Sequence, residues 1–194
     1  MIQKFSLDSI SVRDLSELDI PHAINYWYSS PEGFIESIGV DPKKMGTAEE
    51  TQKGLESKIF RNKELKESKL NALTITYQNK PIGFHSINPL IDDDYGIFHA
   101  HIWDQNFRGK GIGTISYPLA LRVFMDRFNL KRILFKTPSQ NTAAIRVKEK
   151  IGFRAIGEEK ISFGIIQDGT LAKVFEVTRE EILKVPSNIK NTPL

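Results

Sequence analysis

Two histidines have the spacing most suited to proton transfer in this 194-residue chain. His99 and His101 lie two positions apart in a strand-like run, so their side chains are expected on one face of that strand. Imidazole titrates near neutral pH, and either ring could act as a base. The alternatives are hydrogen-bonded structural histidines, which is the interpretation we favour for His85, or a metal site. A metal site has little support, because no third ligand is apparent and the chain has no cysteine.

The second chemical feature is the stretch QNFRGKGIGT, residues 105–114. Glycines at every second position precede an expected helix over residues 111–128. The free N–H groups and the dipole at a helix start attract anions, and glycine lets a phosphate approach the backbone closely. Arg108 and Lys110 add positive charge. The spacing excludes a Walker loop and a dinucleotide fingerprint. The structural alternative is a turn that caps the helix, with its cations in solvent.

These residues resemble a known family. Arg108-x-x-Gly111-x-Gly113 is similar to the signature of the GNAT superfamily of acyl-CoA-dependent N-acetyltransferases. A second motif resembles the same family: Asn141, a helix, then Gly152-Phe153 leading into a strand. About thirty residues separate the motifs and hold one helix and one strand, as in the family. The resemblance covers residues 70–178 and is closest to the branch of ribosomal-protein N-terminal acetyltransferases.

The resemblance implies acetyl-CoA as co-substrate. The loop amides would bind the pyrophosphate, the strand before the loop would pair with the pantetheine arm, and Asn141 would contact the pantetheine or the leaving sulfur. The implied cofactor-binding residues are His101, Ile102, Trp103, Arg108, Gly109, Lys110, Gly111, Ile112, Gly113, Thr114 and Asn141. The catalytic candidates are His101, His99 and Asn141.

One position departs from the family pattern. Many members carry a tyrosine as general acid seven residues after the asparagine, and Lys148 stands there instead. A lysine could donate the proton, but on this helix we expect Lys148 to point to solvent. The thiolate would then be protonated through water, by a serine or threonine, or by no enzyme group. This departure also leaves open a non-catalytic acyl-CoA-binding regulatory module.

The amine acceptor is expected near the N-terminal helices. Tyr26, Trp27 and Phe34 could form an aromatic wall, with Glu36 attracting the ammonium group; the alternative is that the rings pack in the core. The sequence does not choose between a small amine and a protein N-terminus.

Charge and hydropathy exclude other classes. The chain has 27 lysines and arginines against 24 acidic residues, a net charge of +3, which is too sparse for a nucleic-acid-binding face. No run reaches the ~18–20 apolar residues of a membrane span, and no signal peptide is evident. We therefore expect a cytoplasmic protein, without a membrane or nucleic-acid partner, that is a monomer or a homodimer.

The elements that must position these residues predict an α/β (α+β) fold in one domain over residues 1–185, with a C-terminal tail at 186–194. The family fold implies a mixed, mostly antiparallel sheet of about seven strands with helices on both faces. Strands are expected at 4–13, 70–78, 80–90, 95–104, 131–137, 153–164 and 171–178. Helices are expected at 21–30, 47–66, 111–128, 141–152 and 179–184. Leu55, Ile59, Phe60 and Leu65 should line the inner face of the helix over 47–66.

Overall fold

A computed structural model of the chain describes residues 6–91 and 93–185, and the expected tail at 186–194 lies outside these residues. Its described strands form one sheet in the order β1-β2-β3-β4-β5-β7-β6. Every neighbouring pair is antiparallel except β4 and β5, which run parallel. The strands are β1 (Ile10–Asp14), β2 (Ala72–Tyr77), β3 (Lys80–Ile91), β4 (Tyr95–Ile102), β5 (Arg132–Pro138), β6 (Arg154–Ile161) and β7 (Thr170–Thr178).

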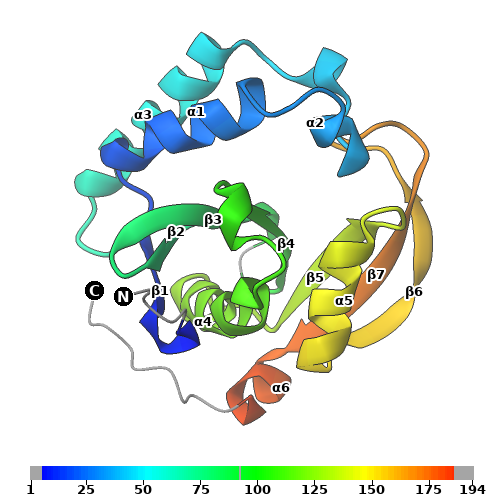
Figure 1. The fold of residues 1–194 in the computed structure, drawn as a ribbon. Coiled ribbons are helices and arrows are strands. Elements are labelled where there is room, and N and C mark those ends of the chain that lie inside the picture. Colours follow the sequence, from blue (N-terminus) through cyan, green and yellow to red (C-terminus); the bar gives the residue numbers. More distant parts are fainter. Residues whose placement is uncertain (1–5, 92, 186–194) are drawn as a thin grey trace.

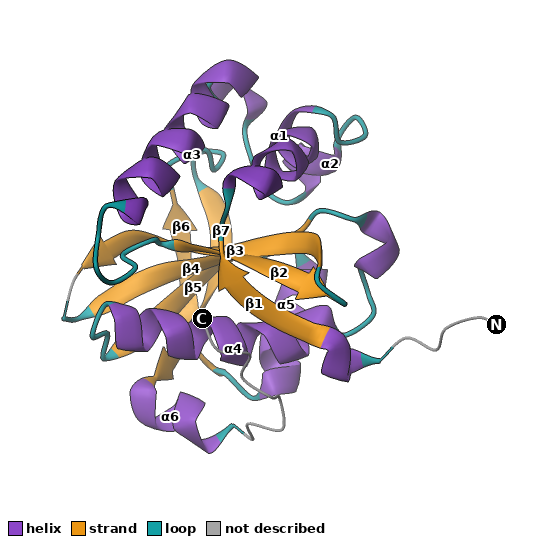
Figure 2. Cartoon of the chain, turned by 90° about the vertical axis from the view of Figure 1, so that its left-hand side faces the viewer, coloured by secondary structure: helices purple, strands orange, loops and turns teal. Residues whose placement is uncertain are grey.

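Helices cover both faces of this sheet, so the predicted fold class is confirmed (Figure 2). One face carries α1 (Ile20–Tyr28), α2 (Phe34–Ser37) and α3 (Ala48–Lys63), and the other carries α4 (Ile112–Arg127), α5 (Thr142–Ile151) and α6 (Arg179–Lys184). The organisation as a single domain stays a prediction.

Local sequence rules set several element boundaries. At the start of α3, Glu50 N–H donates to Thr47 Oγ1 at 3.1 Å and Thr47 N–H donates to the Glu50 carboxylate at 2.7 Å, a reciprocal cap. Helix α5 ends at Gly152, whose φ of 88° suits glycine. A two-residue turn, Gln78-Asn79, joins β2 to β3 with positive φ at both positions.

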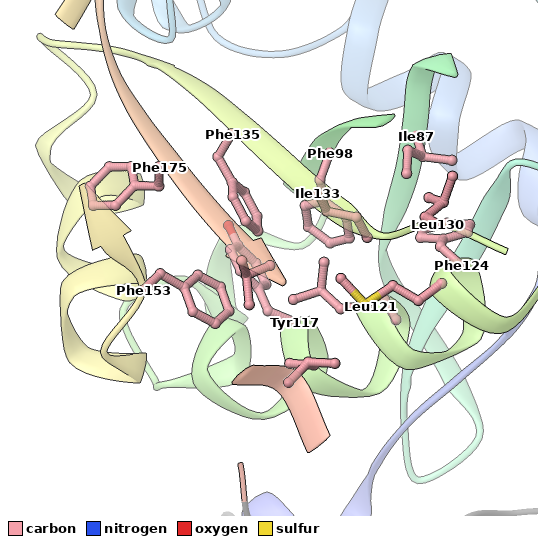
Figure 3. Packing of buried hydrophobic residues seen from close by; sticks show 14 of the residues in the cluster. Ile87, Phe98, Tyr117, Leu121, Phe124, Leu130, Ile133, Phe135, Phe153 and Phe175 are labelled. Carbon is pink, nitrogen blue, oxygen red and sulfur yellow. The ribbon is translucent and has the colours of Figure 1, made fainter. Parts of the chain in front are cut away.

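The main core lies between α4 and the sheet (Figure 3). Its centre is aromatic, and the rings of Phe98, Tyr117 and Phe135 lie within about 6 Å of one another. Proline has no backbone N–H to donate, yet α4 continues past Pro118 to Arg127. Burial of Pro118 and its neighbours against the sheet offsets the missing backbone donor.

The prediction for the inner face of α3 was wrong for two residues. Ile59 is buried and Leu55 packs beside it, but Phe60 is 62% exposed. Consecutive helix residues project about 100° apart, so the narrow contact with α1 takes Ile59 and leaves Phe60 outside. Leu65 follows the end of the helix and is half exposed.

Candidate functional site

Strands β4 and β5 are paired only where they begin. Three residue pairs join them, and among the described residues the last is Ile97 with Leu134. Beyond that pair β4 stays with β3 as far as Ile102, and β5 stays with β7 as far as Pro138, so β4 and β5 part (Figure 1). The facing strand edges carry backbone N–H and C=O groups with which an extended ligand could pair.

The glycine loop follows β4 directly. A short 3-10 turn, Gln105–Phe107, leads into it, and Gly111 is the N-cap of α4. Gly109 and Gly111 have φ of 73° and 81°, a backbone region that glycine occupies without strain. A Cβ added to Gly109 would meet no heavy atom within 4 Å, so the space beside this backbone is open. With the dipole of α4 behind it, the loop fits an anionic group.

The other loop residues fix the position of this loop. A Cβ at Gly113 would lie 2.8 Å from Val147 Cγ1, so glycine allows α4 and α5 to approach closely there. Ile112 is buried, so only its backbone could face a ligand. Thr114 Oγ1 donates to the Gly111 carbonyl at 2.7 Å and caps the turn. Lys110 lies 5.8 Å from the centre of the Phe107 ring.

The sequence suggested that Arg108 adds a free positive charge to the loop. In the structure its side chain is held by other groups. Its guanidinium donates to the carbonyls of Ile102 and Trp103 at 3.2 and 3.4 Å and lies 4.1 Å over the centre of the Phe34 ring. Arg108 therefore ties the loop to the end of β4 and to α2. Its backbone N–H donates to the Gln105 carbonyl at 3.1 Å, so this group is used within the turn itself.

Asn141 stands at the end of the parted strands, as the N-cap of α5. Its side-chain oxygen accepts a hydrogen bond from Ala144 N–H at 3.2 Å. The cap uses the oxygen and not the Nδ2 amide, whose two N–H groups are the part suited to donate to a ligand.

His101 lies among aromatic rings on the α1 side of the sheet. Its Nδ1 is 3.0 Å from the hydroxyl of Tyr26, its ring stacks on Phe84 at 4.9 Å, and Trp27 closes it edge-on at 4.7 Å. Burial, aided by His99, lowers the pKa of His101 to about 3. The ring is therefore neutral at pH 7 and a weak proton acceptor. Phe84 could not be singled out from the sequence, because its contact with His101 depends on the β3–β4 register.

His99 is held differently from its neighbour. Its Nε2 lies 2.5 Å from the carbonyl oxygen of Asn88, so Nε2 carries the proton and Nδ1 carries the lone pair. Burial lowers the pKa of His99; the Asn88 carbonyl opposes this effect, and the charge of Lys148 adds to it.

His85 points to the opposite face of the sheet, into the core. It is fully buried against the rings of Phe98 and Tyr117, at 4.9 and 5.3 Å. Neither ring nitrogen meets a partner at hydrogen-bonding geometry, although the His99 backbone lies near enough to favour the charged ring slightly. Burial lowers the pKa of His85 to about 3. This location fits its structural interpretation.

The expected acceptor residues come together only in part. Tyr26 is buried and Trp27 half-buried, and Phe34 lies edge-on to Tyr26 at 5.8 Å. Glu36 is exposed on α2, outside the ring cluster.

Lys148 overturns the expectation that it points to solvent: it is 4% exposed. Its Nζ lies 5.3 Å from the centre of the Phe135 ring and 5.5 Å from that of Tyr117, and it donates to the Ala144 carbonyl at 3.1 Å. Burial lowers its pKa to about 7. The helix pattern held a signal, since Ala144, Val147 and Ile151 place position 148 on the apolar face of α5.

The segment after α2 crosses to the loop between β6 and β7. Val40 forms an antiparallel bridge with Ile166, and Asp41 N–H donates to the Ile165 carbonyl at 2.8 Å. Lys44 pairs with Asp168 at 2.5 Å. We call this connection, residues 39–44 with 165–168, the strap. It joins the α1–α2 layer to the β6–β7 hairpin beyond the point where β4 and β5 part (Figure 1). The sequence held no signal for this contact between segments over 120 residues apart.

A separate groove of about 900 Å³ lies between α1 and α3, with Ile20, Ile24, Lys53 and Phe60 in its lining. It contains none of the candidate site residues. Within residues 6–91 and 93–185, no cluster of three or more possible ligands could hold a metal ion. In that same part of the chain, no helix has the length and apolar character that crossing a membrane requires.

Comparison with known proteins agrees with this geometry. Residues 10–154 match the model of the acetyltransferase (GNAT) domain. This match spans most of the chain, which therefore belongs to the GNAT acetyltransferase family.

Solved structures share the fold at low sequence identity. Spermidine N-acetyltransferase from Vibrio cholerae, in complex with CoA and spermine, has a TM-score of 0.70 and 17% identity over 91% of this chain and 99% of its own. Ribosomal-protein-S5-alanine acetyltransferase from Vibrio fischeri has a TM-score of 0.68 and 19% identity over 91% and 96%. The aminoglycoside acetyltransferase AAC(6')-Ib, in complex with paromomycin and acetyl-CoA, has a TM-score of 0.68 and 16% identity over 93% and 99%.

Proposed function

We propose that this protein transfers the acetyl group of acetyl-CoA to a primary amine in a ternary complex. The observation that carries the proposal is the parting of β4 and β5 directly before an open, positive-φ glycine loop at the start of α4. One feature supplies free strand edges for an extended amide-containing arm, and the other supplies backbone donors for a pyrophosphate. CoA contains both groups.

In this proposal the backbone N–H groups of residues 109–113 bind the pyrophosphate, because those of Arg108 and Thr114 already donate to the carbonyls of Gln105 and Gly111. The β4 edge around His101, Ile102 and Trp103 pairs with the pantetheine arm, and Asn141 Nδ2 donates to it. Backbone N–H groups on that edge would stabilise the oxyanion that forms when the amine attacks the thioester.

The attacking amine must be neutral, so a base has to take its proton. Of the two candidate histidines, His99 suits this role better, because its Nδ1 keeps a lone pair while Nε2 is fixed by Asn88. His101 is engaged by Tyr26 and enclosed by rings. We propose that His101 shapes the acceptor wall with Tyr26, Trp27 and Phe34, and that Glu36 attracts the amine at the entrance.

The strap bears on the size of the acceptor. It bounds the acceptor side between α2 and the β6–β7 loop, which favours a small amine or the free end of a peptide over an internal lysine of a folded protein. The spermidine and ribosomal-protein enzymes of this fold represent these two acceptor types.

The test is release of free thiol from acetyl-CoA with a panel of polyamines, aminoglycosides and short peptides with free N-termini. We expect release with at least one amine and none without an amine. If the protein binds acetyl-CoA but releases no free thiol with any amine, the result would favour a regulatory module over an enzyme. A protein that does not bind acetyl-CoA at all would refute the whole proposal.

A further inference from the structure

A buried cation stands where β4 and β5 separate. The last β4–β5 pair is Ile97 with Leu134, and Phe135 is the next residue of β5. Lys148 Nζ lies 5.3 Å from the centre of the Phe135 ring. On the other strand, His99 is two residues past the last pair, and the charge of Lys148 lowers its pKa. The Lys148 ammonium therefore lies at the apex of the two parted strands.

The surroundings of this ammonium do not explain it as a structural ion pair. None of the ion pairs found among the described residues involves Lys148. Its one hydrogen bond there goes to the Ala144 carbonyl, although an ammonium has three donors. The faces of Phe135 and Tyr117 offset part of the cost of burial. A buried cation with unused donors is suited to a group that becomes negative.

We propose that Lys148 donates the proton to the sulfur of CoA as the thiol leaves. This inference rests on the proposed acetyl transfer and assigns to that reaction an acid that the sequence left open. The ammonium comes from the α5 side of the sheet, whereas His99 and the ring cluster lie on the α1 side. The acid and the base thus reach the reacting thioester from opposite faces.

The proposed step balances as follows. The amine nitrogen forms a bond to the thioester carbon, and the carbon–sulfur bond breaks with its electron pair on sulfur. The base takes one proton from the amine, and Lys148 gives one proton to sulfur and becomes a neutral amine. Solvent then restores the proton on Lys148 and removes the proton from the base. The products are the N-acetyl amide and free CoA thiol, with no further reactant.

Lys148 is surrounded by groups that keep the same charge near neutral pH, whereas Lys148 itself titrates there. Burial raises the pKa of Tyr117 on α4, so that hydroxyl stays neutral. Burial lowers the pKa of His99 on β4, which keeps the ring neutral there. Phe135 of β5 does not titrate, and Glu149 on the same helix pairs with Lys173 of β7 at 2.8 Å. The pKa of Lys148 itself is about 7, close to the value at which a general acid works best.

The experiment compares Lys148→Met and Lys148→Arg with Lys150→Met, a control at an exposed lysine of the same helix. For the amine that the wild type acetylates, kcat/KM should fall as the pH rises above about 7, where Lys148 loses its proton. Lys148→Met should lower kcat by about 10²–10⁴-fold and abolish this basic limb. Lys148→Arg keeps the charge but not a proton that can be released at this pH, so it should also lose the limb.

Three further measurements separate catalysis from structure. The Kd for acetyl-CoA should stay within about threefold in Lys148→Met, and its thermal midpoint should be unchanged or higher, because an apolar chain of similar length replaces a buried cation. Mass spectrometry of the wild type with acetyl-CoA should show Lys148 unmodified. Lys150→Met should keep the wild-type kcat and pH profile.

Each outcome decides between the two proposals. A wild type that releases no thiol with any amine refutes the acetyltransferase proposal itself. A wild type that turns over while Lys148→Met keeps kcat within about threefold, with the basic limb intact, refutes the acid role alone. An acetyl group on Lys148 would also overturn that role, because the side chain would then act as a nucleophile.

Discussion

His85 provides the sharpest test of the energetics of this fold. The substitution His85→Phe keeps an aromatic ring against Phe98 and Tyr117 and removes two buried nitrogens that lack partners. A buried polar group left without a hydrogen bond costs about 1–3 kcal/mol. Because phenylalanine is slightly larger than histidine, part of this gain is lost to tighter packing. We expect the variant to be more stable than the wild type by about 1 kcal/mol at pH 7.5.

Acid increases this difference. The pKa of His85 is about 3 in the folded chain, against an ordinary value of 6.5. Between these values the unfolded chain binds one more proton than the folded chain, so stability falls as the pH falls through that interval. The loss is ~1.4 kcal/mol per pH unit, or about 2 kcal/mol between pH 6.5 and pH 5. The variant lacks this loss and should exceed the wild type by about 3 kcal/mol at pH 5.

The assay is urea unfolding followed by the fluorescence of Trp27 and Trp103 at pH 7.5 and pH 5. His99 and His101 also add acid sensitivity, but both remain in the variant, so the double difference isolates His85. The control is His22→Phe, which makes the same change at an exposed ring of α1 and should alter stability by less than about 0.5 kcal/mol. If His85→Phe loses as much stability as the wild type on acidification, the argument from burial is refuted.

Three further substitutions test the loop and the frame around it. Gly109→Ala places a Cβ at φ 73° and should cost about 1–2 kcal/mol of stability and raise the KM for acetyl-CoA. A variant with the same free energy of unfolding and the same KM as the wild type would contradict the loop assignment. Gly113→Ala forces a methyl group against Val147 and should cost about 1–3 kcal/mol by overpacking. An unchanged thermal midpoint would show that the Val147 side chain can shift to make room. Asp19→Asn should cost about 3 kcal/mol, because it breaks the pair with Arg13 at 2.6 Å while the site stays buried. Burial alone would raise the pKa of Asp19, but its hydrogen bonds hold that pKa below its usual value; stability should therefore fall as the pH drops below about 4, and Asp19→Asn should remove part of this fall.

Helix ends and turns followed from the sequence because short-range contacts set them. The cap of Thr47 with Glu50 and the left-handed Gly152 involve residues at most four apart. Where such a pattern occurs, the backbone N–H and C=O groups at the helix end find hydrogen-bond partners among neighbouring residues, whatever the helix packs against. The mistaken placement of Phe60 marks the limit of this reasoning, because the width of the contact with α1 decided which residues were buried.

The roles of polar site residues depended on contacts across the sheet. His99 and His101 were correctly expected on one face, since strand alternation requires it. That His101 is enclosed by Tyr26, Trp27 and Phe84 follows from α1 packing over the β3–β4 register. Their pKa values follow from that burial, which no spacing in the sequence reports.

The sequence by itself determined the family, the glycine loop and the order of elements, because two motifs at a fixed separation encode a strand, a turn and a helix start. Only the tertiary structure decided where β4 and β5 part and which side chains meet at that point. In the structure Lys148 lies at the apex of the parted strands and not in solvent as expected, and Arg108 donates to backbone carbonyls. The physical reason is that burial and charge depend on segments distant in sequence, whereas caps and turns depend on neighbours.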